Sequence, residues 1–296
     1  MNGNNAKETH RLTLIGMPCW GVNQPFHSLA VVAGVAREAG FAVSLYDLNI
    51  DFYRLVDESE RKWWEEDNTD YWKSDDLPQE LWEKRTDWLH DRLDTIMGAA
   101  DPSLICFSVN SYTRYFSVRA AKYLKSVRPD IPIMFGGVDC FPGEANTELL
   151  SGRDTPHCDI ICQGECEIAF RRYLKNFVET GDWRTQIPGF AYYDRNTLVD
   201  TGDTELPTLK EKQPLPAFDL FDLSLYTDKG SLPFYLSRGC VYRCNFCSER
   251  PNSRRCRCRS AGEAVEEIKA ILPFAWEYAD VPTLHFSDSL VNANMK

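Results

Sequence analysis

The first 180 residues alternate between short runs rich in apolar residues and longer amphipathic stretches. Five short runs predict buried strands, at residues 12–17, 42–46, 104–109, 131–135 and 159–162. Apolar positions at helical spacing predict helices between or after them, at residues 28–38, 116–127 and 167–177. Such strands, separated by helices, are typical of a parallel sheet covered on both faces. We therefore expect a doubly wound α/β domain, Rossmann-like or flavodoxin-like.

The segment between the second and third predicted strands, residues 51–100, is longer than a usual crossover. It contains five tryptophans among many acidic residues: Trp63, Trp64, Trp72, Trp82 and Trp88. Within it, Trp82, Leu89, Leu93 and Ile96 recur at roughly helical spacing, which predicts one or two amphipathic helices packed on the domain. We expect the tryptophans to anchor this packing. The alternative is that they form a cap over a substrate.

The rest of the chain divides into a hairpin, a linker and a second group of elements. Residues 187–201 alternate as a hairpin, and residues 206–225 contain three prolines that favour an extended linker. A strand at 232–236, a helix at 261–272 and a strand at 283–286 follow. We expect three parts: residues 1–180 with the helical insertion 51–100, residues 181–230, and residues 231–296.

Three cysteines follow the strand at 232–236 with the spacing C-x3-C-x2-C: Cys240, Cys244 and Cys247. A 4Fe-4S cluster held by four thiolates is complete, whereas three thiolates leave one iron open to a small molecule. Cysteines two or three apart also build zinc sites, which need a fourth ligand. Because Cys256 and Cys258 are available for that role, zinc or another cluster is the alternative.

This motif resembles that of the radical S-adenosylmethionine (SAM) enzymes. The resemblance implies a 4Fe-4S cluster on Cys240, Cys244 and Cys247, with SAM bound at the open iron and cleaved to a 5'-deoxyadenosyl radical. It also implies that Phe246 lies beside the adenine and that Asp288, after the last strand, belongs to the SAM-binding residues. A partial (β/α) barrel and an external electron donor of the flavodoxin or ferredoxin type are implied as well.

A second resemblance concerns the ends of the strands, where ligands of doubly wound sheets bind. The third strand ends at Ser108, the fourth in a glycine pair, and the fifth is followed by Gly-Glu-Cys-Glu at residues 164–167. These positions resemble the cobalamin-binding domains of radical enzymes, with Cys166 in place of a glycine. The resemblance implies cobalamin bound by Ser108, Gly136, Gly137, Gly164 and Glu165. Nucleotide binding or a receiver-like role is the alternative.

The loop after the first strand lacks the Asp-x-His-x-x-Gly motif that supplies a histidine to cobalt in many cobalamin proteins. His27 is the only histidine near this loop, and we expect it to begin the helix at 28–38 rather than bind cobalt. The same loop also lacks G-x-G-x-x-G, which disfavours a dinucleotide as the ligand.

Composition narrows the class of protein. The 296 residues carry 44 acidic against 33 basic side chains, a net charge of -11, which argues against nucleic acid as a partner. Five arginines between Arg250 and Arg259 are the local exception, and this cluster either is a solvated loop or faces an anionic group. No apolar run approaches the about 20 residues of a membrane span. A polar N-terminus without a signal peptide, together with 11 cysteines, favours reduced thiols in a cytoplasm.

The segment after Leu232 is short for the catalytic domain that the motif implies. About 65 residues follow Leu232, whereas three-quarters of a (β/α)8 barrel needs about 200. We therefore expect a C-terminally truncated chain, with a complete first domain and the first third of a radical SAM domain.

Together, these features predict a cobalamin-dependent radical SAM enzyme. The expected reaction is methyl transfer from methylcobalamin to an unactivated carbon of a small-molecule or peptide substrate. Two alternatives stay open. One is a radical cyclisation or rearrangement without methyl transfer, and the other is a cobalamin-binding carrier or sensor fragment without catalysis.

Overall fold

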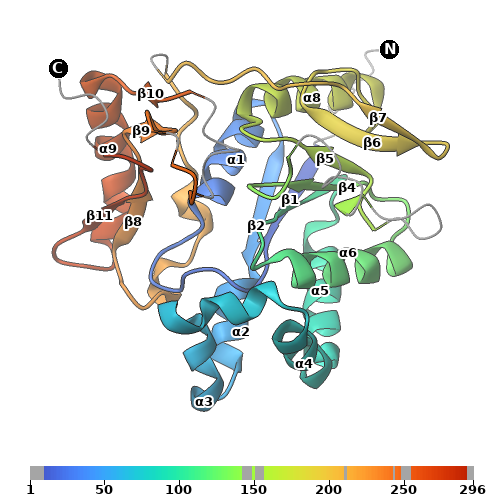
Figure 1. Ribbon diagram of the computed structural model, residues 1–296, viewed down its shortest axis with the longest axis horizontal. Coiled ribbons are helices and arrows are strands. Elements are labelled where there is room, and N and C mark those ends of the chain that lie inside the picture. The colour runs from blue at the N-terminus through green and yellow to red at the C-terminus, as the bar shows by residue number, and fades with distance from the viewer. Residues whose placement is uncertain are drawn as a thin grey trace, which may run out of the picture.

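The structure is a computed structural model that describes residues 10–141, 149–150, 157–209, 212–242, 244–247 and 255–291. Its largest element is a seven-stranded sheet in the order β2-β1-β3-β4-β5-β6-β7 (Figure 1). The strands are β1 (Arg11–Gly16), β2 (Ala42–Asp47), β3 (Leu104–Ser108), β4 (Ile133–Gly136), β5 (Ile160–Cys162), β6 (Phe190–Asp194) and β7 (Thr197–Asp200). The first five are parallel, in the order typical of flavodoxin-like sheets. The predicted, mostly parallel α/β sheet is confirmed.

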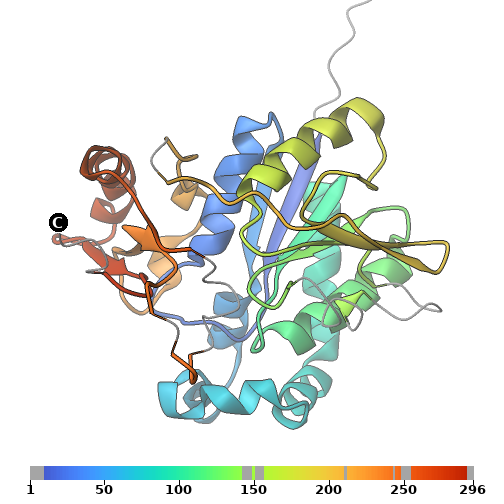
Figure 2. The ribbon, with the colours of Figure 1, turned by 45° about the horizontal axis from the view of Figure 1, so that its top comes forward.

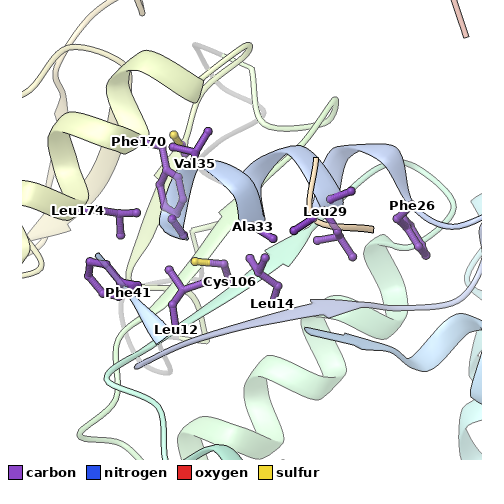
Figure 3. Packing of buried hydrophobic residues seen from close by; sticks show 14 of the residues in the cluster. Leu12, Leu14, Phe26, Leu29, Ala33, Val35, Phe41, Cys106, Phe170 and Leu174 are labelled. Atoms are coloured by element: carbon purple, nitrogen blue, oxygen red, sulfur yellow. The ribbon is translucent and has the colours of Figure 1, made fainter. Parts of the chain in front are cut away.

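Both faces of the sheet are buried at β1, β3, β4 and β5, which explains the continuous apolar runs of these strands. On one face, α1 (His27–Glu38) and α8 (Glu167–Thr180) pack against Leu12 and Leu14 of β1 and Cys106 of β3 (Figure 3). On the other face, α5 (Thr86–Ala100) and α6 (Arg114–Val127) cover side chains such as Phe107 of β3 and Phe135 of β4.

The insertion before β3 forms more helices than the sequence predicted. It contains α2 (Leu48–Leu55), α3 (Glu58–Arg61), α4 (Asp76–Lys84), α5 and two 3-10 helices. Trp64, Trp72 and Trp82 are buried in the core on the α5 and α6 side, so these tryptophans anchor packing as expected. The Trp64 indole N–H also donates to the Asn49 side chain at 2.8 Å, which ties the 3-10 helix at Lys62–Trp64 to α2.

The hairpin β6–β7 extends the sheet instead of standing apart from it. Its strand β6 pairs antiparallel with β5, Ile160 opposite Tyr192 and Cys162 opposite Phe190. Because Phe190 and Tyr192 are buried on this edge, the hairpin shares its core with α8.

A smaller unit follows the linker and lies beside α1, on the side away from the sheet (Figures 1 and 2). Its strands β8 (Ser231–Phe234) and β11 (Thr283–Phe286) are parallel and are connected through α9 (Ala261–Trp276). A short antiparallel ribbon, β9 (Ser237–Arg238) with β10 (Arg257–Cys258), completes it. Within the described ranges, every helix is too short or too polar to span a bilayer.

The linker is fixed along α1 by a close approach of two backbones. A Cβ on Gly34 would lie 2.2 Å from the Leu215 carbonyl oxygen, so a glycine is required there. Nearby, the Ala217 N–H donates to the Ala30 carbonyl at 2.9 Å. The two terminal guanidinium nitrogens of Arg37 each donate to one carboxylate oxygen of Asp219. The apolar core therefore continues from the sheet through α1 into the smaller unit.

A buried hydrogen bond joins the end of the linker to the sheet. The Tyr226 hydroxyl donates to Asp47 Oδ2 at 2.5 Å, at the end of β2. Burial, and to a smaller extent the nearby Asp51 charge, raise the pKa of Asp47 to about 7. The hydrogen bonds from Tyr226 and from the backbone N–H groups of Ile50 and Asn49 act in the opposite direction, because they favour the charged carboxylate.

This raised pKa predicts a pH-dependent stability. The unfolded chain releases the Asp47 proton near pH 4, whereas the folded chain holds it until about pH 7. The contribution of Asp47 is therefore fully present below pH 4 and is lost as the pH rises towards 7. The free energy of unfolding of the wild type should fall between pH 5 and 7 relative to that of Asp47→Asn, by at most about 1.4 kcal/mol per pH unit. Urea titrations at several pH values measure this, with Asp219→Asn as control. Parallel pH profiles for wild type and Asp47→Asn would contradict it.

Candidate functional site

A cavity of about 350 Å³ lies at the carboxyl ends of the parallel strands, between the sheet and the smaller unit. All five residues predicted to bind cobalamin line it: Ser108, Gly136, Gly137, Gly164 and Glu165. From the other side it is lined by Tyr235, Ser237, Arg238 and Gly239 of the smaller unit. The structure therefore brings the predicted residues together at one place, as expected for the ends of parallel strands.

The glycine pair after β4 allows two strand ends to approach each other. Gly137 has a φ of +120°, and a Cβ on it would lie 2.4 Å from the Val109 carbonyl oxygen. The Val109 N–H donates to the Gly136 carbonyl at 2.6 Å, and the Ser108 hydroxyl lies 3.2 Å from that of Ser28. This close packing leaves the strand ends open towards the cavity, where a ligand can approach the backbone.

Thiols form part of the cavity wall, from Cys106, Cys162 and Cys166. Burial raises the pKa of Cys106 and of Cys162, so both are neutral thiols. Cys106, Cys140, Cys158 and Cys162 are buried. Cys166 is only half-buried, because the turn that contains it faces the cavity.

His27 begins α1, as the sequence predicted, and its ring lines the cavity. The ring meets Tyr235 edge-on, with 4.5 Å between centroids. Burial, together with the charges of Arg238 and Arg259, lowers the pKa of His27 to about 3, so the imidazole is neutral. Its Nε2 is buried and has no hydrogen-bond partner among the described residues.

The cysteine motif lies on a loop that starts at the cavity. Gly239, a cavity residue with a φ of +77°, immediately precedes Cys240. Cys240 and Cys247 are half-buried, and Cys244 is exposed. The Tyr242 N–H donates to Cys240 Sγ at 3.4 Å.

The donor set of this loop fits an iron–sulfur cluster. All three cysteines are free thiols, as cluster ligands must be. In the part of the chain that the structure describes, no three His, Cys, Asp or Glu side chains converge on a single metal ion. The ligands of an iron–sulfur cluster do not need to converge on one ion, because each thiolate binds a different iron of the cluster.

The two residues predicted to bind SAM lie in different surroundings. Phe246 is 92% exposed. The Asp288 carboxylate accepts hydrogen bonds from the N–H groups of Leu236 and Ser237 and from the Ser237 hydroxyl, at 2.6 to 3.1 Å. Asp288 thus fixes the segment that leads into the cysteine loop, and its neighbours Ser287 and Ser289 line the cavity.

Four charged side chains connect the sheet to the smaller unit, and we call them the charge cluster: Glu165, Glu167, Arg238 and Arg257. Arg238 binds Glu167 and lies 3.1 Å from Glu165 Oε2, while Arg257 binds the other oxygen of Glu165. Burial is the largest single influence on Glu167 and would raise its pKa. The charges of Arg238 and Arg257, together with the hydrogen bonds from Arg238 and from a backbone N–H, hold the pKa of Glu167 below its usual range. Glu167 and Arg238 are therefore charged at neutral pH.

Sequence reasoning did not identify Arg238 or Arg257 as site residues, and it noted Glu167 only as part of the Gly-Glu-Cys-Glu turn. The arginine-rich stretch was the available signal, since an anionic group was one expectation for it. In the structure Arg257 faces Glu165, and Arg259 pairs with Glu267 at 2.6 Å. Arg250 and Arg254 of the same stretch lie outside the described residues.

Curated proteins similar to this chain include methyltransferases and a cyclase. An uncharacterised methyltransferase, PH0819 of Pyrococcus horikoshii, is 26% identical over 68% of the chain and 42% of its own length. An anaerobic magnesium-protoporphyrin IX monomethyl ester cyclase of Cereibacter sphaeroides is 25% identical over 63% and 31%. The cobalamin-dependent radical SAM methyltransferase TokK of Streptomyces tokunonensis is 26% identical over 51% and 22%. The matched part is thus less than half of each relative.

A solved structure shares the fold. It is that of TsrM from Kitasatospora setae, a radical SAM methyltransferase with tryptophan substrate and a SAM analogue bound. The TM-score is 0.56 at 17% identity, over 94% of this chain and 48% of the other. No protein-family model matches the sequence.

The close approach at Gly137 gives a stability prediction. Gly137→Ala should lower the free energy of unfolding by about 2–4 kcal/mol, because the new Cβ is strained and overlaps the Val109 backbone. Gly98→Ala is the matched control. A Cβ there meets nothing within 4 Å, so alanine in α5 should be neutral or stabilise by up to about 1 kcal/mol. Urea denaturation measures both variants. If Gly137→Ala is as stable as the wild type, the packing of these strand ends is wrong.

Proposed function

Since the chain is related to the cobalamin-binding radical SAM enzymes, we propose that it holds cobalamin and a 4Fe-4S cluster for a methyl transfer to an unactivated carbon. One observation carries this proposal. Gly239, the residue before Cys240, lines the same cavity as the five residues predicted to bind cobalamin. The two cofactors would therefore lie next to each other, which a reaction that uses both requires.

Each group of residues has a distinct task under this proposal. Cys240, Cys244 and Cys247 would hold the cluster, and the strand ends at Ser108, Gly136, Gly137 and Gly164 would hold the nucleotide tail of cobalamin. When bound, the cluster with SAM supplies a 5'-deoxyadenosyl radical and methylcobalamin supplies the methyl group. The chain itself orients these groups and keeps water away from them. The neutral His27 contributes an uncharged wall to the cavity.

The roles of Phe246 and Asp288 in binding SAM stay predictions. Asp288 would act by fixing Leu236 and Ser237 ahead of the cysteine loop. Phe246 extends into solvent beside Cys247, where it would cover the cofactor once that is bound. An external electron donor and a small-molecule or peptide substrate complete the proposed reaction.

A second candidate reaction is a cyclisation without methyl transfer. The similarity to the magnesium-protoporphyrin IX monomethyl ester cyclase favours it. A third, non-catalytic possibility is a cobalamin carrier or sensor.

Anaerobic reconstitution with iron and sulfide tests the cluster. We expect about four irons per chain and release of 5'-deoxyadenosine when SAM and dithionite are added. Cys240→Ala, Cys244→Ala and Cys247→Ala should each lose the cluster, whereas Cys256→Ala and Cys258→Ala should retain it. A cluster that forms without releasing 5'-deoxyadenosine would support the binding-only alternative. Zinc bound in place of iron would contradict the enzyme assignment.

Cobalamin binding is tested separately, by adding a side chain to the cavity wall. A Cβ on Gly136 has only ordinary contacts, the nearest at 3.9 Å from Cys162. Gly136→Val should therefore fold but bind hydroxocobalamin at least about tenfold more weakly than the wild type, by more than about 1.4 kcal/mol. Equilibrium dialysis measures the affinity, with Gly98→Ala as the control. Equal affinities would show that cobalamin does not use this cavity.

A further inference from the structure

The charge cluster consists of two carboxylates from one unit and two guanidinium groups from the other. Glu165 and Glu167 flank Cys166 in the turn after β5, whereas Arg238 and Arg257 stand opposite each other on the β9–β10 ribbon. Their side chains are between 8% and 20% exposed. The two negative and two positive charges sum to zero. Removing any one of them therefore leaves a net charge in the cluster.

The cluster is directly connected to the cysteine loop. Arg238 is two residues before Cys240, and a Cβ on the intervening Gly239 would lie 2.7 Å from the Arg255 carbonyl oxygen. The backbone at the start of the loop is therefore packed closely against Arg255 and Cys256, the two residues before β10. The Arg238 guanidinium is fixed further by the Tyr235 ring, whose centroid lies 4.5 Å away.

We propose that Glu165 and Glu167 are positioning residues that hold Arg238 and, through it, set both the place of Cys240 and the reduction potential of the cluster bound there. The inference rests on the proposed function, since it concerns the cluster. Its basis is the geometry of the described residues: two fixed carboxylates, one guanidinium between them, and a cysteine two residues further on.

The electrostatic part of this proposal has a definite sign. The potential of an iron–sulfur cluster depends on the net charge around it. Neutralising Glu167 leaves the Arg238 charge partly uncompensated, which stabilises the added electron and raises the potential. Removing the Arg238 charge leaves the carboxylates uncompensated and lowers the potential. A purely structural role would instead move the potential in the same direction in both variants.

The experiment is a redox titration of the reconstituted full chain, followed by electron paramagnetic resonance. We expect Glu167→Gln to raise and Arg238→Met to lower the midpoint potential, while Arg238→Lys stays near the wild type. Asp219→Asn and Arg37→Met are the matched controls and should leave it unchanged. Their ion pair also joins two segments, but Arg37 is ten residues along α1 from His27, about 15 Å from the cavity end of the helix.

Hydrogen exchange of the cluster-free chain tests independently whether the two glutamates and Arg238 hold the start of the cysteine loop in place. Amides of residues 237–242 should exchange about tenfold faster in Glu167→Gln, Glu165→Gln and Arg238→Lys than in the wild type, and no faster in Asp219→Asn. Lysine keeps the charge but loses the forked geometry of arginine, so Arg238→Lys separates position from charge.

The outcomes distinguish this proposal from the proposed function. If the wild type forms no four-iron cluster, the proposed function fails, and hydrogen exchange still tests the positioning. If the cluster forms but the potentials of Glu167→Gln and Arg238→Met shift in the same direction or not at all, the electrostatic role is overturned. If exchange at 237–242 is unchanged in all three variants, the positioning role is overturned as well.

Discussion

The charge cluster is the interaction that fixes the smaller unit against the end of the sheet. The apolar core around α1 brings the two units together, but apolar contacts alone allow small displacements between them. Ion pairs between Glu165 and both arginines, and between Glu167 and Arg238, require one relative position. Because removing one partner of a buried ion pair typically costs about 3–5 kcal/mol, this position is strongly favoured over displaced ones.

The cavity exists because of a second constraint, the crevice at the edge of the sheet. Strand order reverses between β1 and β3, and the connections that follow these two strands pass on opposite faces. Ser108 ends β3 at this point, and Gly136 ends the neighbouring β4. The smaller unit closes the crevice from the side of α1, so that the cavity is bounded by both units.

The sequence predicted the sheet well, because strands buried on both faces must be continuously apolar. The ends of β2 and β11 were predicted to within one residue, and the strand-end residues met at one cavity because parallel strands share an edge. The ribbon β9–β10 was missed. Each of its strands has two residues, too few for any periodicity. The ion pair between Arg257 and Glu165 could not be predicted either, because the two residues are 92 positions apart in the chain.

The turn after β5 shows how one element serves both the cavity and the contact between the units. Gly164, with a φ of +65°, lines the cavity, and so does Glu165. Both carboxylate oxygens of Glu165 are already bound to arginines of the smaller unit. A ligand in the cavity can therefore meet the backbone of this turn, while the Glu165 carboxylate holds the ribbon that leads to Cys240. Any ligand that displaces the turn must also break these ion pairs, one of which belongs to Arg238, two residues before Cys240.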